Sequence, residues 1–448
     1  MDRTNKNMHL PLFVQQALMA LGNAGFEGYV VGGAVRDYLR GASAHDWDIA
    51  TNALPQQTKE VFSAHHIVCI GEEYGTVQVQ LDGQTLEITT YRKDGPYIDA
   101  RHPEEVSFTG DIIADLSRRD FTMNAVAYNP AVGYVDPFGG MEDIKAGVLR
   151  CVGEPRVRFA EDALRILRAV RFAAQLGFSV ESETANAMQA GQALLAGVSA
   201  QRIYAELEKA VCGAHTVPAF LRFGTVLAAV VPEIGQTLGF AQNSIYHKYD
   251  VWQHSVESLG IVQPKTPLLC FATLLHDIAK PACCTQGEDG HRHFRGHPEM
   301  GAQMVWEILT RLQMPVALKK QVSTLVLLHD TPLANTRDAV SEIVVKHGVA
   351  FMQALLQVKI ADTLTHAPAA INRRMAEIQR AQTYLEEAIA SGRCFTLQEL
   401  AVNGVDMLAI GFEGAGVGAV LHALLVEVAR GEMENEREVL LAYAKEQL

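Results

Sequence analysis

Two aspartates separated by one residue, Asp46 and Asp48, are the most direct sign of chemistry in this sequence. Residues two apart in a strand point to the same face, so both carboxylates would share one side and Trp47 would take the other. Paired carboxylates are hard oxygen ligands that suit Mg²⁺. The spacing therefore predicts a magnesium site on a strand, although an Asp-x-Asp pattern by itself also occurs in many surface loops.

A glycine pair precedes these aspartates. Residues 29–31 are apolar and predict a short buried strand. Gly32 and Gly33 end it, and residues 34–39 predict a helix that carries Arg36. The N–H groups at a helix N-terminus behind paired glycines bind phosphate oxygens. A phosphate-binding turn followed by a metal-binding Asp-x-Asp resembles the layout of polymerase-beta-like nucleotidyltransferases.

A third carboxylate is predicted next to this pair. Residues 77–81 and 86–90 alternate apolar and polar side chains on either side of an Asp-Gly turn, which predicts a β-hairpin. Glu87 lies off the apolar face of the second strand, and we expect that strand to neighbour the one bearing Asp48. Glu87 is therefore a candidate catalytic residue, and an ordinary solvent-facing glutamate is the alternative.

Two further segments supply groups that bind a nucleotide. Residues 91–108 have no period and many turn formers and charges, which predicts a mobile loop beside the sheet. After it, seven residues combine two cations with two groups that bind hydroxyls: Arg118, Arg119, Asp120 and Asn124. A triphosphate and a ribose need these residue types.

The pattern turns helical near residue 155. Asp162 and Arg165 are three apart on a predicted helix and share a face. An aspartate accepts and an arginine donates, so the pair could recognise a base edge; a helix ion pair is the alternative. Basic residues recur through this region and could line an RNA path, with a solvated helix face as the alternative: Arg158, Arg165, Arg168, Arg171, Arg202 and Lys209.

The C-terminal half contains a second group of ligand-type residues. Imidazoles and carboxylates bind Mn, Fe, Ni or Zn, and two metals can clamp a phosphate and activate water. A lone histidine on an apolar helix is usually a core residue, but here several candidates follow one another: His254, His276, Asp277, His297, His329 and Asp362.

Composition bounds the class of protein. A chain of 448 residues with 48% hydrophobic residues predicts two to four domains with ample core. The formal charge of −13 argues against a nonspecific nucleic-acid binder, whereas a specific binder needs only a local basic strip. The seven cysteines have no zinc-ligand spacing. With no apolar run of membrane length and no signal-peptide core, we expect a cytoplasmic protein with reduced thiols and no membrane contact.

These motifs together resemble bacterial tRNA nucleotidyltransferases, the CCA-adding enzymes whose template is the protein. The matching segments, in family order, are 32–37, 46–48, 94–101, 118–125, 136–143, 161–165 and 199–209. His102 stands where the family usually has a second arginine. The second group of residues resembles the HD phosphohydrolase domain, whose usual motif reads His-Asp-Ile-Gly-Lys-Pro; here Ala279 replaces the glycine.

The resemblance implies an α+β chain, with a polymerase-beta-like nucleotidyltransferase sheet domain followed by all-α neck, HD and tail domains. We expect the head at 1–150 and a helical neck that binds nucleotide and RNA at 151–240. The HD phosphohydrolase-like domain would follow at 241–370, and a tRNA-binding tail at 371–448.

It also implies a reaction: Mg²⁺-dependent addition of the 3′-terminal CCA to tRNA from CTP and ATP, with release of pyrophosphate and no nucleic-acid template. Asp46 and Asp48 would hold Mg²⁺, the 118–120 motif would bind the ribose 2′-hydroxyl, and Asp162 and Arg165 would pair with the incoming base. A divalent transition metal would occupy the HD domain. The full set of nucleotide-binding candidates is Gly32, Gly33, Arg36, Arg119, Asp120, Asn124, Asp162, Arg165 and Arg168, and the RNA-binding candidates are Arg171, Arg202 and Lys209.

Several alternatives remain at this point. The loop motif at 94–101 favours full CCA addition or A addition over CC addition, because CC-adding relatives lack it. Poly(A) polymerases carry a basic Gly-Arg-Arg-Phe run that is missing here. A protein acting mainly as an HD metal-dependent phosphohydrolase is a further alternative. A tRNA-binding protein with an inactive head is disfavoured by the intact Asp-x-Asp.

Overall fold

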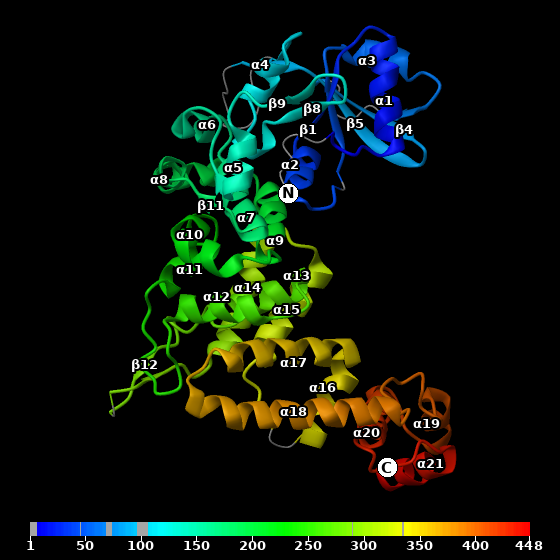
Figure 1. Ribbon diagram of the computed structural model, residues 1–448. Coiled ribbons are helices and arrows are strands. Elements are labelled where there is room, and N and C mark those ends of the chain that lie inside the picture. The colour runs from blue at the N-terminus through cyan, green and yellow to red at the C-terminus, as the bar shows by residue number, and fades with distance from the viewer. Residues whose placement is uncertain (1–6, 45, 69–73, 96–105, 289, 334–335) are drawn as a thin grey trace. The chain divides into compact units, whose positions relative to one another are not determined.

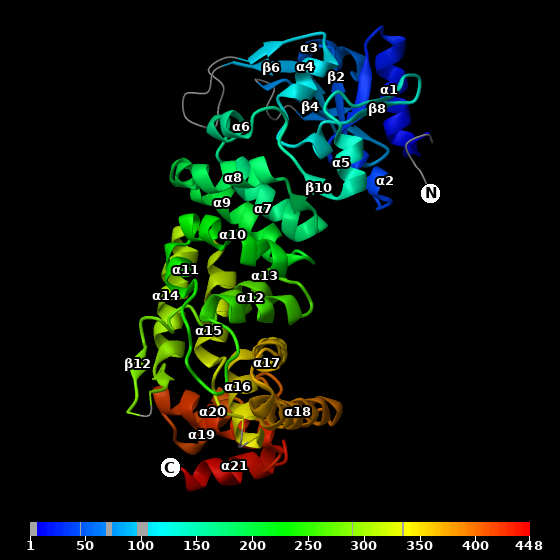
Figure 2. The ribbon, with the colours of Figure 1, turned by 60° about the vertical axis from the view of Figure 1, so that its left-hand side comes forward.

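The computed structural model describes residues 7–44, 46–68, 74–95, 106–288, 290–333 and 336–448. The chain forms two compact units, Met1–Pro232 and Glu233–Leu448 (Figures 1 and 2). The first unit combines a mixed β-sheet with helices, and the described part of the second is almost entirely helical. The α+β class predicted from the sequence is therefore confirmed.

A seven-stranded sheet organises the first unit, with strand order β3-β4-β5-β2-β1-β8-β9. Neighbouring strands run antiparallel except β2 and β5, which are parallel and place Asp48 opposite Glu87. The strands are β1 (Gly28–Val31), β2 (Asp48–Thr51), β3 (His66–Val68), β4 (Thr76–Leu81), β5 (Gln84–Thr90), β8 (Ala127–Asn129) and β9 (Gly133–Val135).

Alternation along β1 explains how the sheet is buried on both faces. Val30 belongs to a core on one face that also contains Val14 and Leu21 of α1 (Leu12–Asn23). Figure 1 shows α1 and α3 (Pro55–Val61) together at this side of the sheet. Tyr29 and Val31 point the other way, into a second core with Leu116.

The remaining elements of this unit lie between the strands of the sheet or after them in the chain. The remaining helices of this unit are α2 (Gly33–Arg40), α4 (Ile112–Ser117), α5 (Gly140–Ala146), α6 (Pro155–Glu161), α7 (Leu164–Leu176), α8 (Ser182–Gly191), α9 (Ala200–Val211) and α10 (Thr216–Val230), with 3-10 turns η2 (Thr122–Asn124) and η3 (Gln192–Gly197). The two small ladders are antiparallel β6 (Arg92–Asp94) with β7 (Val106–Phe108) and parallel β10 (Val148–Leu149) with β11 (Ser179–Val180).

The second unit is a set of packed helices with one small ladder, β12 (Thr285–Gln286) with β13 (Arg292–His293). Figure 2 shows α16, α17 and α18 side by side. The helices are α12 (Val251–Ile261), α13 (Pro267–Leu275), α14 (His297–Arg311), α15 (Val316–Leu328), α16 (Thr336–His347), α17 (Val349–Leu364), α18 (Pro368–Ala390), α19 (Gly404–Ile410), α20 (Ala415–Arg430) and α21 (Arg437–Glu446), with α11 (Pro232–Thr237) at the start of the unit.

Two predictions about local structure are corrected. Strand β2 begins at Asp48, so Asp46 lies just outside it rather than on a strand face shared with Asp48. The segment around Asp162 is not one helix, because α6 ends at Glu161 and Asp162 has an extended backbone before α7 starts. Most of the loop predicted at 91–108 lies outside the described residues, and its flanks form β6 and β7.

In the part of the chain that the structure describes, no single helix combines the length and apolar composition needed to cross a membrane. The bent pair of α19 and α20 meets that test only when the two helices are counted together.

Candidate functional site

The turn between β1 and α2 has a backbone that only glycine adopts easily. Gly32 has φ +72° and ψ −131°, and it directly precedes the first turn of α2. A Cβ added there would lie 3.4 Å from Nη1 of Arg119 and 3.8 Å from Oδ2 of Asp48. The main chain of this turn is therefore bare between a cation and a carboxylate, where a phosphate and its metal would meet.

Three carboxylates gather beside this turn. Asp48 and Glu87 are paired in register on parallel strands, and residues paired in register point to the same face. Nε2 of Gln78 donates to Oε1 of Glu87 over 2.8 Å. Burial, together with the negative charges of Glu87 and Asp46, raises the pKa of Asp48 to about 6 against the opposing effect of Arg119. Mutual repulsion of this kind is what a divalent cation relieves.

Two neighbouring arginines, Arg118 and Arg119, are held by one buried aspartate. Asp115 in α4 binds Nη2 of Arg118 at 2.8 Å and Nη2 of Arg119 at 3.1 Å. These two cations outweigh the effect of burial and lower the pKa of Asp115. Asp115 thus fixes both arginines, of which Arg119 lies beside the Gly32 turn, a role that sequence reasoning missed although the i, i+3 and i, i+4 spacing was visible.

A chain of polar contacts links α2, η2 and α7. Asp120 binds Nη2 of Arg168 at 2.7 Å and accepts from Nδ2 of Asn124 at 3.1 Å. Asn124 in turn accepts from Nη1 of Arg36 at 2.9 Å. Burial raises the pKa of Asp120, but Arg168 and the hydrogen bonds outweigh it and lower the pKa to about 2. Four predicted nucleotide-binding residues are therefore one network.

An aromatic ring supports this network. The guanidinium carbons of Arg36, Arg168 and Arg171 lie 5.3, 5.5 and 4.1 Å from the ring centroid of Phe172. Contacts of this length are cation–π interactions. Phe172 was not predicted, because an aromatic residue in a helix gives no sign in the sequence that arginines will stack on it.

The side chains of Asp162 and Arg165 do not bind each other. Oδ2 of Asp162 binds Nη2 of Arg202 at 2.8 Å, and its Oδ1 accepts from the N–H of Leu164. Arg165 is buried and binds Glu161 at 2.6 Å. The alternative of a simple Asp162–Arg165 helix ion pair is therefore wrong, and Asp162 stands in the break between α6 and α7.

The predicted RNA-binding residues differ in how far their side chains are exposed. Arg171 is buried and binds Glu206 at 3.0 Å, so its side chain is internal and our expectation that it lines an RNA path is corrected. Arg202 is half-buried against Asp162, whereas Lys209 is exposed at the end of α9.

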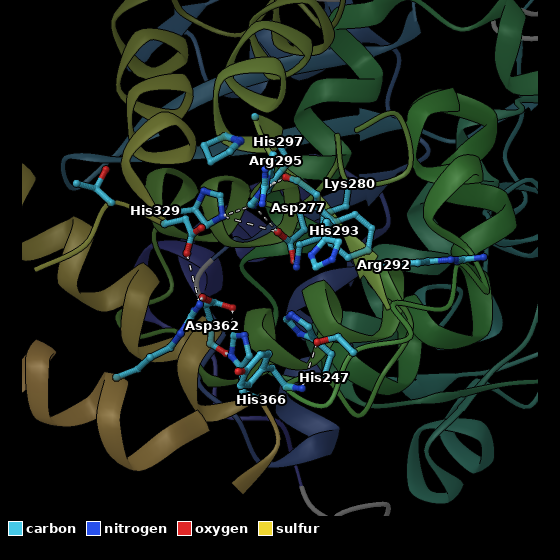
Figure 3. Close-up of a pocket in the computed structure, with 18 of the residues that line it drawn as sticks. His247, Asp277, Lys280, Arg292, His293, Arg295, His297, His329, Asp362 and His366 are labelled. Atoms are coloured by element: carbon cyan, nitrogen blue, oxygen red, sulfur yellow. Dashed lines mark hydrogen bonds and ion pairs between the residues drawn. The ribbon is translucent and has the colours of Figure 1, made fainter. Parts of the chain in front are cut away.

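The second unit brings all six predicted ligand residues into one buried cluster. His254 lies in α12, His276 and Asp277 follow α13, and His297 opens α14. His329 follows α15 and Asp362 lies in α17. Figure 3 shows Asp277, His297, His329 and Asp362 around one cavity, with Lys280 close to Asp277.

Asp277 divides this cluster into two sets of ligands. Its Oδ2 lies 3.2 Å from Nε2 of His276 and 3.4 Å from Nε2 of His254. Its Oδ1 lies 3.4 Å from Nε2 of His297 and 3.7 Å from Nε2 of His329. Asp362 joins the first set, with Oδ1 2.9 Å from Nε2 of His254. Two ligands about 2.1 Å from a common metal are separated by about 3.0–3.5 Å, so each of the two sets, which share Asp277, would fit one cation.

In three of these histidines, a hydrogen bond made by Nδ1 leaves Nε2 free to bind a metal. Nδ1 of His276, His297 and His329 lies 2.6–2.8 Å from a main-chain carbonyl oxygen, which can only accept. Nδ1 therefore carries the proton in the neutral ring and Nε2 presents its lone pair. Nε2 of His297 and Nε2 of His329 are buried and lie 3.2 Å apart. Two nitrogen lone pairs that face each other in this way fit a cation between them.

Comparison with known proteins decides the family. A family model described as "Poly A polymerase head domain" matches residues 28–150, one described as "Probable RNA and SrmB- binding site of polymerase A" matches 177–234, and one described as tRNA nucleotidyltransferase domain 2 matches 299–444. The CCA-adding enzyme of Geobacillus kaustophilus is 32% identical over 425 residues, 94% of this chain and 93% of that protein. The chain belongs to the CCA-adding enzyme family.

Other CCA-adding enzymes align over shorter stretches. The enzyme of Geobacillus thermodenitrificans is 45% identical over 226 residues, and that of Leuconostoc mesenteroides is 45% identical over 201. These matches span 50% and 45% of this chain and only about half of those relatives' length, 55% and 50%.

Solved CCA-adding enzymes have the same fold. The Bacillus stearothermophilus enzyme, crystallised with CTP, superposes with a TM-score of 0.75 at 28% identity, covering 97% of this chain and 96% of that one. The Thermotoga maritima enzyme, in complex with tRNA, gives a TM-score of 0.60 at 19% identity, covering 98% and 97%, and shows the fold alone.

Proposed function

We propose that this member of the CCA-adding enzyme family adds the 3′-terminal CCA to tRNA from CTP and ATP, without a nucleic-acid template. The observation that carries the proposal is the register of Asp48 with Glu87 beside the bare Gly32 turn. The match to CCA-adding enzymes over almost the whole chain favours full CCA addition over the A-adding alternative. The segment 94–101, which bore on that choice, lies mostly outside the described residues.

Asp46, Asp48 and Glu87 would hold Mg²⁺, on which the nucleotidyltransferase family generally depends. When bound, the ion supplies positive charge that favours the attacking hydroxyl and the leaving pyrophosphate. The N–H groups at the Gly32–Gly33 turn and the guanidinium of Arg119 would bind the triphosphate.

Other residues of the first unit would select and place the substrates. Asp120 and Asn124, held by Arg36 and Arg168, would bind the ribose hydroxyl. Asp162 would accept from the base amine. Arg165 would donate to the ring nitrogen only if its guanidinium leaves Glu161 and the carbonyls of Arg158 and Arg118.

The tRNA would contact the helices after the head. Lys209 and Arg202 are candidates on α9, and the region 371–448 is the candidate tail. The division at 1–150, 151–240, 241–370 and 371–448 stays a prediction, as does a cytoplasmic location.

The test is incubation of the protein with tRNAs that lack CCA, that end in CC or that end in CCA, with each nucleoside triphosphate alone and in combination. We expect two C additions from CTP, one A addition from ATP on tRNA ending in CC, and none on complete tRNA. Addition of A to CC ends with no addition of C would instead support the A-adding alternative.

The buried cluster of the second unit favours a second activity. We propose that His254, His276, Asp277, His297, His329 and Asp362 hold two divalent transition metals and that this unit hydrolyses phosphoesters. Bound metals would supply charge for a phosphate and a nucleophilic water. Lys280, 2.7 Å from Asp277, would add a cation for the phosphate.

Metal content tests this second proposal independently of turnover. The chain loaded with Mn²⁺ should retain about two metal ions per chain by elemental analysis, and His276→Ala should lose both the metals and the hydrolysis. His422→Ala, an exposed histidine in α20, should change neither. Wild-type protein that retains no metal above the level of His276→Ala would contradict the site.

A further inference from the structure

The buried metal-ligand cluster of the second unit opens into cavities on two sides. One cavity of about 800 Å³ is lined by Asp277 and by residues of the β13–α14 segment, among them Arg292, Phe294 and Arg295. A second, of about 520 Å³, is lined by residues of α17 and α18, among them Lys359 and Arg373. His329, Asp362 and Tyr246 line both, so the cavities meet at the ligand cluster.

Cations line both cavities, and Arg374 is common to the two. In the first, Arg295 is exposed and Lys280 lies beside Asp277, and Figure 3 shows both at the cavity wall. In the second, the Arg373 side chain is 88% exposed and Arg374 lies 3.5 Å from Asp362. Positive charge therefore lines both cavities, where arginine side chains can stack on a nucleic-acid base on either side of one central phosphate.

An aromatic side chain stands where the cavities meet. Tyr246 is 54% exposed, yet its main chain is fixed, because its carbonyl accepts from the N–H of Ala367 at 2.8 Å. Phe294 lines the first cavity. Exposed aromatic faces beside cations are the surfaces on which nucleic-acid bases stack.

We propose that this site cleaves a linear phosphodiester with one nucleoside in each cavity, as in a short single-stranded oligonucleotide. The proposal rests on the hydrolase activity proposed above and names its substrate class. The oxygen of a water molecule bonds to phosphorus, the P–O bond to one nucleoside breaks, and the departing oxygen takes a proton. A phosphomonoester would fill only one of the two cavities.

The experiment uses the full chain loaded with Mn²⁺ and compares the release of AMP from the dinucleotide pApA with the release of phosphate from AMP, and bis(p-nitrophenyl) phosphate with p-nitrophenyl phosphate. We expect kcat/KM for each diester to exceed that for the matching monoester by at least about tenfold, the value of stacking one additional aromatic group. Preference for the monoesters would overturn the substrate class while leaving the hydrolase in place. Absence of any hydrolysis that depends on His276 would overturn the hydrolase itself, and this proposal with it.

Two arginine variants, one in each cavity, test whether the substrate places a nucleoside in both. Arg295→Ala and Arg373→Ala remove exposed cations from the first and second cavities respectively, so neither should disturb folding. Each should lower kcat/KM for pApA about five- to tenfold and leave p-nitrophenyl phosphate within about twofold. Arg380→Ala, also exposed on α18 but outside both cavities, is the matched control. An unchanged rate on pApA for either cavity variant would contradict a substrate that spans both sides.

Discussion

At the scale of single residues, Asp162 is the group that we propose selects the base. Cytosine and adenine present an amine donor beside a ring-nitrogen acceptor, whereas uracil and guanine present a carbonyl in place of the amine. An ionised carboxylate can only accept. Asp162 lies in the break between α6 and α7, half-exposed, and Arg202 fixes one of its oxygens at 2.8 Å.

We expect Asp162→Ala to lose discrimination against UTP and GTP by about tenfold to a few hundredfold, because each unpaired acceptor costs about 1–3 kcal/mol. Single-nucleotide incorporation of all four triphosphates on tRNA lacking CCA measures this. Glu183→Ala, an exposed acidic residue of α8, should discriminate like the wild type. Wild-type discrimination by Asp162→Ala would place base selection elsewhere.

At the scale of elements, the β1–α2 turn contains two adjacent glycines, Gly32 and Gly33, whose alanine variants can be compared. Gly32 has φ +72°, and a Cβ there would approach Arg119 and Asp48. An added Cβ on Gly33 would lie 3.6 Å from the flexible end of Arg36, without a strained backbone. We expect Gly32→Ala to lower the free energy of unfolding by about 1–3 kcal/mol and Gly33→Ala to change it little. Urea unfolding of both variants measures this, and equal losses would contradict the assigned turn.

The network between η2 and α7 makes stability depend on pH. The depressed pKa of Asp120, about 2, means that its ionised form stabilises the fold. That contribution is complete above the ordinary pKa of about 3.9 and is lost as the pH falls toward 2. Asp120→Asn should therefore cost about 1–2 kcal/mol at pH 7, discounted because Arg168 is partly exposed, and progressively less below pH 4.

Urea unfolding at several pH values compares Asp120→Asn with Asp82→Asn, which neutralises an exposed aspartate in the β4–β5 turn. Only the Asp120 variant should show a cost that shrinks in acid. A cost that is independent of pH would mean that the pattern of hydrogen-bond donors and acceptors at this position matters, not the charge.

Local sequence patterns predicted the strands and helices better than they predicted which side chains bind each other. The alternation of apolar and polar side chains and the Asp82-Gly83 turn predicted the β4–β5 hairpin, and its register confirms it. Both turn residues have a positive φ. The break before α7 was missed because the surrounding residues favour helix, while the Asp162 carboxylate caps the N–H of Leu164. Glu206 was also missed as the partner of Arg171, because that contact joins separate helices.

At the scale of the whole molecule, the chain carries two chemical centres in two compact units. The carboxylates near Asp48 belong to Met1–Pro232, and the histidine cluster around Asp277 belongs to Glu233–Leu448. The six candidate ligand positions could be predicted because their residue types and their order along the chain resemble the HD domain. Their division by the two oxygens of Asp277 could not, since it depends on the packing of five helices.

The most direct test of the account is incorporation of CMP and AMP into tRNA lacking CCA by Asp48→Asn, with His276→Ala measured in parallel. Asp48 is destabilised as an anion by burial and by Glu87 and Asp46, so its asparagine variant should fold with an unchanged or higher melting temperature. The account predicts that Asp48→Asn loses incorporation by at least about a hundredfold while His276→Ala retains it. Incorporation near the wild-type rate by Asp48→Asn would contradict the central claim that these carboxylates perform nucleotidyl transfer.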